Sequence, residues 1–446
     1  MAGRPSRCRA LATALRDALW LGLLASPLVA FDLVPGYERQ PRLHWQLDDL
    51  GIIVAGVFLA RLAVLVAGCH HLGLRLSQLT SHGRQRLARA WQQGRRWPAL
   101  TLTVLFGLAA AFPFAPFVSR TAIDVATLAG IYVVLGLGLN IVVGLAGLLD
   151  LGYVAFYAVG AYGYGLLYQY CDWSFWMALP VCGLAAGLAG LVLGFPVLRL
   201  KGDYLAIVTL GFGEIIRIVL NNWDSLTNGP NGIMGIPRPS LFGLEMSRVA
   251  RDGGHTFHQF FGLDYDAGHR LIFLYLLVLG LMAGTMLVVE RLKESRLGRA
   301  WVAMREDEIA CAAMGIDTTL TKLAAFGLGA AWAGLAGAVY AARQGFVNPE
   351  SFTFIESATI LAIVVLGGMG STAGVTCAAL AVVIIPELVR ELAGFRMLIF
   401  AAVMVGLMIV KPEGLLPARR RIYDLHPDDR RSLEQDRQSL AEVHRQ

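Results

Sequence analysis

The stretch that decides the fold is Glu290–Arg343, which reads ERLKESRLGRAWVAMREDEIACAAMGIDTTLTKLAAFGLGAAWAGLAGAVYAAR. It leaves one apolar run, passes through about thirty polar and amphipathic residues, and enters a second apolar run. A charged helix between two such runs has no lipid-facing role, so it is expected on the water side, in the simplest case as a solvated loop helix. Gly315 stands where such a helix would stop. The spacing before it predicts one continuous helical face, made of Leu297, Trp301, Met304, Glu308 and Ala312.

The composition of the whole chain is that of a polytopic membrane protein. Of its 446 residues, 56% are hydrophobic and only 16% are charged. These proportions lie outside the range of soluble proteins. The predicted fold class is therefore all-α: a transmembrane helical bundle of about 12 spans or re-entrant segments.

Twelve apolar runs are candidates for these spans, and most approach the roughly 20 residues that cross the hydrocarbon core. The first run follows an Arg-rich start and is interpreted as a span, with a cleaved signal peptide as the alternative. Some of the shorter glycine-rich runs are also consistent with re-entrant segments. The runs lie at about 18–31, 50–69, 98–118, 122–146, 151–170, 174–198, 204–221, 270–290, 323–342, 356–372, 374–393 and 396–411.

Positive charge between the runs predicts the orientation of the chain. Residues 70–97 contain six Arg and no acid, and Arg419, Arg420 and Arg421 follow the last run. Both clusters belong in the cytoplasm under the positive-inside rule. Twelve spans from a cytoplasmic N-terminus satisfy this rule, keep the polar part of Glu290–Arg343 inside, and place 222–269 outside.

The same pattern predicts three parts of the chain. Residues 1–97 form an N-terminal extension with two membrane spans and a basic cytoplasmic loop. Residues 98–417 form the transmembrane domain, within which 291–322 is the polar cytoplasmic segment. Residues 418–446 form a polar cytoplasmic tail, as a short helix or without regular structure.

Several functions are excluded by missing motifs. The chain has four lysines, none of which follows a glycine, so no phosphate loop of the Walker type exists. ATP would therefore have to be bound by another polypeptide.

The sequence also has no H-E-x-x-H or G-x-S-x-G motif, which argues against an intramembrane enzyme. The spacing of His255, His258 and His269 is no metal signature, and the net charge of +6 comes from Arg beside spans rather than from a nucleic-acid patch.

Small residues at helical spacing predict close helix contacts within the bilayer. One stripe consists of Gly183, Gly187, Gly190 and Gly194, and a second consists of Ala330, Gly334 and Ala338. Either stripe is also suited to a subunit interface.

Two charged residues fall inside an apolar run, at Glu214 and Arg217. Either charge is costly in a membrane without a partner, so the two are expected to pair or to line a polar path. A zwitterionic amino acid would match such a pair, with its carboxylate near the Arg. A purely structural ion pair is the alternative.

Five motifs, in order from Pro98 to Pro417, resemble the permease subunits of ABC importers, and more narrowly the LivM-type permeases of branched-chain amino-acid importers. Two of them, REDEIACAAMGI and KLAAFGLGAAWAGLAGAVYA, are similar to the cytoplasmic coupling segment of that family. GLAGLLDLGYVAFYAVGAY and LGGMGSTAGVTCAALAVVIIPELVRE are similar to its two glycine-rich segments. TNGPNGIMGIPRP is similar to its external loop.

The residue patterns and the resemblance together predict three groups of site residues. The residues expected to couple to an ATPase are Trp301, Arg305, Glu308, Ala312 and Gly315. A second group is expected along a translocation path: Asp150, Glu214, Arg217, Gly367, Gly368 and Gly370. The glycines there would expose backbone groups to a polar solute, or would simply make tight turns. The residues expected to face a binding protein, on a loop shaped by Gly and Pro, are Asn228, Gly229, Gly232, Pro237 and Arg238.

The resemblance also implies an assembly in a bacterial inner membrane. Its parts would be this permease, a second homologous permease, two ATP-binding subunits that hold ATP and Mg, and a periplasmic substrate-binding protein. The chain itself would need no cofactor, and would contact lipid and a small amino-acid substrate but no nucleic acid. Leu, Ile or Val is the expected substrate, with urea, short amides or other amino acids as alternatives. An alternative of another class is a self-sufficient ion-coupled transporter with protons carried by Glu214, Asp150 or Glu387.

Overall fold

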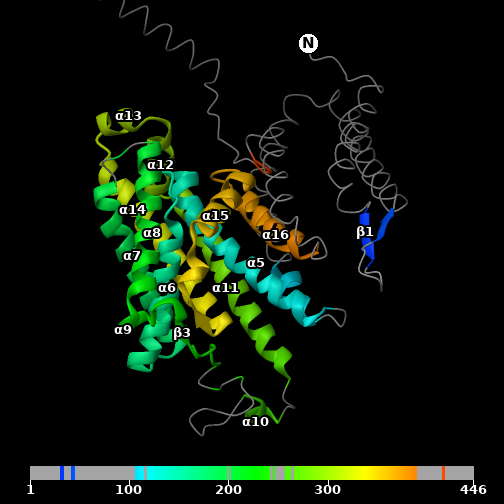
Figure 1. Cartoon of the computed structure of the whole chain (residues 1–446). Helices are drawn as coiled ribbons and strands as arrows, with labels where there is room; N and C mark the ends of the chain where they lie inside the picture. The colour runs from blue at the N-terminus through cyan, green and yellow to red at the C-terminus, as the bar shows by residue number, and fades with distance from the viewer. Residues whose placement is uncertain are drawn as a thin grey trace, which may run out of the picture.

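The computed structural model describes residues 106–388 except 115–117, 198–199, 201, 242–243, 245, 247–256 and 263–265, and also 31–34, 42–45 and 414–416. Over these residues the chain is a helical bundle (Figure 1), as the composition predicts. Most of the predicted spans 18–31 and 50–69, the whole of 396–411, and the predicted tail 418–446 lie outside the described residues.

The described long helices follow the predicted apolar runs closely. They are α5 (Arg120–Leu139), α6 (Tyr153–Cys171), α7 (Phe175–Val197), α8 (Asp203–Asn222), α11 (Ala267–Glu294), α14 (Thr318–Gln344), α15 (Phe354–Gly367) and α16 (Thr372–Leu388). α5 continues through a π-helical turn, η3 (Asn140–Leu145). Within the described residues four helical segments are long and apolar enough to cross a membrane, at Arg120–Leu145, Phe175–Pro196, Gly268–Glu294 and Thr318–Gln344. α15 and α16 are apolar but shorter.

Short elements lie at the two ends of the bundle. At one end are α12 (Arg296–Glu306) and α13 (Glu308–Ala313), and this will be called the α13 end (Figure 1). Toward the opposite end, the α10 end, lie α9 (Asp224–Thr227), η4 (Gly229–Asn231), β3 (Ile233–Met234), α10 (Phe257–Phe261), β4 (Phe346–Val347) and η5 (Pro349–Phe352). β3 and β4 pair antiparallel, with Ile233 opposite Val347. Elsewhere η2 covers Phe112–Phe114, and β1 (Phe31–Val34) pairs antiparallel with β2 (Arg42–Trp45).

The centre of the bundle is held by α14, which packs along α7 and α6. The glycine stripe of α7 faces α14: a Cβ on Gly190 would lie 2.6 Å from the Cβ of Ala330, and one on Gly183 would lie 2.9 Å from Leu335. From the other side, a Cβ on Gly334 would lie 2.6 Å from the carbonyl oxygen of Cys182. The predicted packing role of both small-residue stripes is therefore confirmed, and they join helices within this chain.

Candidate functional site

The polar segment at the α13 end is two helices rather than the single helix predicted. α12 ends at Glu306 and α13 begins at Glu308, because Asp307 adopts an extended backbone and caps α13. The carboxylate of Asp307 accepts hydrogen bonds from the N–H groups of Ile309 and Ala310, at 2.9 and 3.0 Å. Such a side chain favours a new helix start over continuation of the old one. The prediction of one continuous helical face from Leu297 to Ala312 is therefore wrong, and only the part of it within α12 lies on a single helix.

Two of the predicted coupling residues bind other parts of this chain. Trp301 is fully buried, and its Nε1 donates to the carbonyl oxygen of Thr321 at 2.7 Å, which fastens α12 to α14. Arg305 donates from Nη1 to the carbonyl oxygen of Gly144 at 2.5 Å, which fastens α12 to η3. Both side chains are placed to hold the segment in position rather than to present it to a partner.

Glu308 also faces inward. Its Oε1 lies 2.6 Å from the Nζ of Lys322, whose side chain is only 6% exposed. A buried ammonium group needs such a partner, because an unpaired charge in a low-dielectric interior is costly. The ion pair holds the short helix α13 against the N-terminal part of α14.

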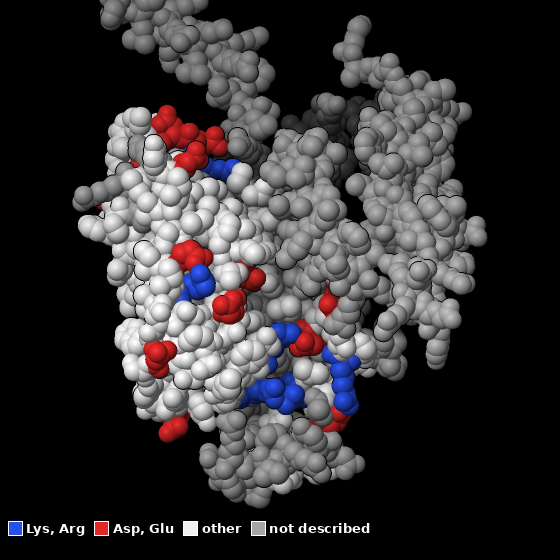
Figure 2. Space-filling model, viewed as in Figure 1, with Lys and Arg blue, Asp and Glu red and all other residues white. Residues whose placement is uncertain are grey.

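The outward surface of the segment is apolar with an acidic border. Ile309 and Met314 are 77% and 83% exposed, and Ala312 is also exposed. Gly315 has φ +82° and open space around it, so it turns the chain from α13 toward α14. Figure 2 shows Asp and Glu side chains gathered at this end of the molecule. Exposed large apolar side chains on a polar segment are typical of a docking surface.

Replacing Glu308 by Gln is expected to loosen α13 from α14, because Lys322 loses its charged partner. The expected loss is roughly 1.5–3 kcal/mol of unfolding free energy. Thermal unfolding of the purified protein in detergent measures it. The double variant Glu308→Gln, Lys322→Met removes both charges and should recover most of the loss. Equal destabilisation by the single and double variants would contradict the pairing role.

The two glycine-rich segments meet next to the π-helical turn. Asn140, fully buried in η3, accepts through Oδ1 a hydrogen bond of 2.8 Å from the N–H of Gly370. A Cβ on Gly144 would lie 2.6 Å from the same nitrogen. Gly368 and Gly370 have φ +104° and +83°, which permits the sharp turn between α15 and α16. The structure thus brings the two segments into contact, and their role as a translocation path remains a prediction.

A contact network connects the α13 end to this glycine turn. Arg305 binds the carbonyl oxygen of Gly144, and Asn140 in the same turn binds Gly370. On the other side of the turn, Thr372 donates from its hydroxyl to Glu290 at the end of α11. Displacement of α12 would therefore strain η3 and the glycine turn together.

Asp150 lies in the loop between η3 and α6. It is 1% exposed, and its Oδ1 accepts from the N–H of Gly152 at 2.9 Å. Burial raises the pKa of its carboxyl to about 6. The loop packs on α8, where the hydroxyl of Thr209 accepts from the N–H of Leu151 at 3.0 Å.

Glu214 and Arg217 pair with each other on α8, at 2.9 Å between Oε2 and Nε. Their neighbours on the helix, Ile215 and Ile218, are exposed apolar residues. Pairing lowers the cost of two charges on a surface that is otherwise apolar. The structure therefore brings these two predicted path residues together, without bonds to the glycine turn.

We expect Glu214→Gln to lower stability or assembly more than it changes substrate preference, because the pair serves the helix surface. The expected cost is roughly 1–3 kcal/mol. Thermal unfolding measures stability, and the ratio of Leu, Ile and Val uptake measures preference. A changed ratio with unchanged stability would move Glu214 into the substrate path.

The loop predicted to face a binding protein is a folded structure at the α10 end. Asn228 adopts φ +59° and donates from Nδ2 to the carbonyl oxygen of Gly232 at 3.1 Å. Gly229 and Gly232 also have positive φ. Pro237 accepts at its carbonyl oxygen a hydrogen bond of 2.8 Å from the hydroxyl of Tyr164 on α6. The loop is thus fixed to the bundle, and Arg238 follows directly after this anchor.

The sequence did not predict the contacts of several site residues. Glu308 and Gly370 were predicted as site residues, but their partners Lys322 and Asn140 were not. The pair of Asp124 and Arg343 was not predicted at all. Glu356 is another case, since its carboxylate accepts a hydrogen bond of 2.5 Å from the hydroxyl of Tyr132 on α5. A charged residue inside an apolar run was the only sign in the sequence that Glu356 needs a partner, and it does not indicate which residue that partner is.

Four apolar helical segments of membrane-crossing length, with a polar segment tethered at one end, define an integral membrane protein. The chain belongs to the family described as "Branched-chain amino acid transport system / permease component", whose profile matches residues 121–411. A permease component has a non-enzymatic role.

Individual relatives give the same result. The chain is 58% identical to the "High-affinity branched-chain amino acid transport system permease protein LivM" of Escherichia coli K12, over 72% of this chain and 75% of the relative. It is 56% identical to the LivM protein of Salmonella typhimurium over the same shares. It is 24% identical to the LivH permease of Escherichia coli K12, over 65% of this chain and 92% of that protein. No solved structure matches the chain.

Proposed function

We propose that this chain is a membrane-spanning permease subunit of an ATP-driven importer for the branched-chain amino acids Leu, Ile and Val. The observation that carries the proposal is the 58% identity to a LivM permease over three quarters of that relative's length. The apolar surface of the bundle agrees with multi-pass insertion, here into a bacterial inner membrane. A second permease of the LivH kind, to which the chain is 24% identical, would complete the pathway.

The α13 end is the proposed docking surface for one of two separate ATP-binding subunits, which would hold ATP and Mg. Ile309, Ala312, Met314 and Gly315 are exposed there, and the chain has no phosphate loop of its own. In this proposal the segment is held in position by Trp301, Arg305 and Glu308, because each of them binds another part of the chain.

Movement of the docked segment would reach the membrane interior through the contacts of Arg305. A shift of α12 pulls on Gly144 in η3, and η3 is bonded through Asn140 to Gly370. A rigid hydrogen-bonded chain of this kind is suited to convert closure of the ATPases into opening of the glycine turn. Gly367, Gly368 and Gly370 would then expose backbone groups to the passing solute.

The α10 end is the proposed side of substrate delivery. The loop from Asn228 to Arg238 is held there by Gly and Pro turns and by the bond from Tyr164 to Pro237. A preformed loop is suited to contact a periplasmic substrate-binding protein, because little conformational freedom is lost on docking. This orientation also places the α13 end in the cytoplasm, as the positive-inside rule requires.

Reconstitution tests the proposal. The chain, its second permease and the ATP-binding subunits are placed in proteoliposomes, and uptake of radiolabelled Leu is measured with the binding protein added. We expect uptake with ATP and none with a non-hydrolysable analogue. Accumulation driven by a pH gradient without nucleotide would instead favour an ion-coupled carrier, with Asp150, Glu214 or Glu387 as proton carriers. ATP-driven uptake of urea or short amides but not of Leu would reassign the substrate.

A further inference from the structure

The outward face of α8 differs from the outward faces of its neighbours. Of the long helices that the structure describes, only α8 carries charged side chains in the central half of its length. These are Glu214 and Arg217, which will be called the α8 pair. Along the helix Glu214 lies roughly 16 Å from Asp203 at the start and roughly 12 Å from Asn222 at the end. The pair therefore lies well inside the apolar run.

The α8 pair is open toward the outside of the bundle. The side chains of Glu214 and Arg217 are 34% and 29% exposed, and one contact of 2.9 Å joins Oε2 to Nε. Within the part of the chain that the structure describes, neither side chain makes a second hydrogen bond. The terminal nitrogens of Arg217 and the other oxygen of Glu214 are thus left for a further partner. Lipid tails offer neither donors nor acceptors for these groups.

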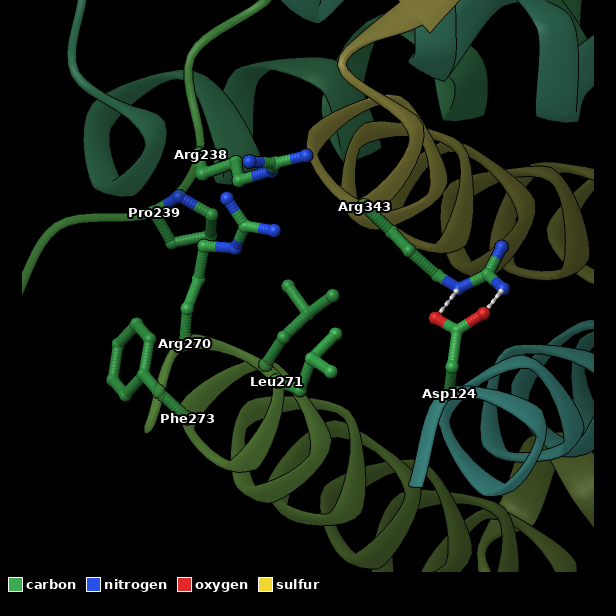
Figure 3. A pocket seen from close by; sticks show the side chains of 8 residues that line it. Asp124, Arg238, Pro239, Arg270, Leu271, Phe273 and Arg343 are labelled. Atoms are coloured by element: carbon green, nitrogen blue, oxygen red, sulfur yellow. Dashed lines mark hydrogen bonds and ion pairs between the residues drawn. The ribbon is translucent and has the colours of Figure 1, made fainter. Parts of the chain in front are cut away.

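An ion pair elsewhere in the bundle shows the contrast. Arg343 on α14 bonds both carboxylate oxygens of Asp124 on α5, with 3.0 Å from Nε to Oδ1 and 2.6 Å from Nη2 to Oδ2. The Arg343 side chain is only 11% exposed. Figure 3 shows this pair beside the small pocket that Arg238 and Arg270 also line. A bidentate contact uses both oxygens of the carboxylate, whereas the α8 pair shares a single bond.

The residues around the α8 pair form a face suited to pack against another helix. Ile207, Gly211, Glu214 and Ile218 fall at i, i+4, i+7 and i+11, which places them on one side of α8. The two isoleucines are exposed, and a Cβ on Gly211 would meet nothing within 4 Å. An open glycine between large apolar side chains leaves a hollow in which a second helix can approach closely.

The outward faces of α7 and α11 lack these polar groups. On α7 the exposed side chains include Leu184, Leu188 and Val192, and the helix contains no charged residue. On α11 the open glycine Gly280 and the exposed Leu287 have no charged residue between them. Lipid tails can cover both faces without leaving a charge unpaired. The face of α8 is therefore the one for which a protein partner offers most.

The course of α8 indicates which protein this partner is. The helix leads through Trp223 into α9 and η4, within the loop at the α10 end that is proposed to receive the binding protein. Its inner face packs on the Asp150 loop through Thr209. A path between two permeases would begin at the receiving loop, so the helix that continues from this loop is placed beside it. A second permease is therefore the partner that fits this face.

We propose that the second permease docks on the outward face of α8, centred on Ile207, Gly211, Glu214 and Ile218, and that the α8 pair bonds a polar side chain of that subunit. The inference rests on the proposed function, which supplies the second permease. It identifies the face of this chain at which the two subunits meet.

Photo-crosslinking tests the contact directly. The full complex is produced in membranes with p-benzoylphenylalanine at Ile218, or at Leu188 on α7 as the control, which is also an exposed apolar residue. We expect irradiation to join the Ile218 variant to the second permease, and the Leu188 variant not to be joined to it. A product of Ile218 with lipid, with another part of the same chain or with a second copy of it would overturn the proposal. So would equal joining from Leu188.

A matched pair of glycine variants tests the shape of the face. Gly211→Leu fills the hollow and should lower recovery of the second permease with the tagged chain roughly 10- to 100-fold. Gly280→Leu on α11 is the control, because a Cβ there also meets nothing within 4 Å. Elution volume and thermal unfolding establish that each variant is folded. Equal recovery with both folded variants, or a loss with Gly280→Leu alone, would contradict the proposal. The crosslinking result decides by itself if Gly211→Leu does not fold.

Uptake of Leu by the same complex in proteoliposomes separates this proposal from the proposed function. If uptake is ATP-driven and Ile218 joins no second permease, the interface fails alone. If Ile218 joins the second permease and no Leu accumulates with ATP, the proposed function fails and the interface stands. If Glu214→Gln changes the KM for Leu and leaves recovery of the second permease unchanged, the α8 pair belongs to the substrate path and its role in docking fails.

Discussion

Replacing Gly160 by Ala is expected to disrupt the packing of α6 against α14. A Cβ at this position would lie well inside contact distance of the carbonyl oxygen of Gly334, and 2.5 Å from its Cα. Neither atom is the flexible end of a side chain, so the two helices would have to separate. Because α14 packs against both α6 and α7, the strain would spread through the bundle. The expected cost is about 3 kcal/mol.

Gly284→Ala is the matched control for this variant. Gly284 also lies in a membrane-crossing helix, α11, but a Cβ there meets nothing within 4 Å. The two variants therefore change helix propensity alike and differ in packing. Thermal unfolding and the folded yield from detergent extracts measure both. Equal behaviour of the two variants would show that the close approach of α6 and α14 is unimportant for folding.

Gly315→Pro is expected to abolish uptake while leaving membrane insertion intact. Gly315 has φ +82°, whereas proline is restricted to about −65°. Its N–H also donates to the carbonyl oxygen of Ala312 at 3.0 Å, and proline would remove this donor. The exposed surface of α13 would then point in another direction. The site is exposed and lies outside the long helices, so the bundle itself should still form.

Gly315→Asn provides the control, because Asn tolerates the left-handed conformation better than other side chains and the space around Gly315 is open. We expect Asn to retain most of the ATP-driven uptake in proteoliposomes and Pro to retain none. Normal uptake by Gly315→Pro, with normal recovery from the membrane, would remove the coupling role from this turn.

The sequence by itself determined the fold class and most helix positions. Inside a membrane, the backbone N–H and C=O groups of an apolar run find no water to bond, so they must bond one another, and a helix satisfies all of them. The runs at 204–221 and 323–342 lie within α8 and α14 for this reason. The glycine stripes were also predictable, since close helix contacts in a bilayer require small residues.

The break between α12 and α13 at Asp307 was harder to predict. Periodicity indicates a single helix across Leu297–Ala312, but the carboxylate of Asp307 caps a new helix and ends the old one. Helical spacing records which face is apolar, whereas a side chain that bonds the backbone can interrupt the helix at little cost. Trp301 and Arg305, which lie before this break, bind within the chain.

Only the tertiary structure decided the partners of the polar residues. Asn140 meets Gly370, Arg343 meets Asp124, and Arg238 comes next to Arg270, all across long separations in sequence. A charged residue in an apolar run shows that it needs a partner, but many partners satisfy this need equally well. The packing of helices selects one of them, because it fixes which side chains lie within bonding distance.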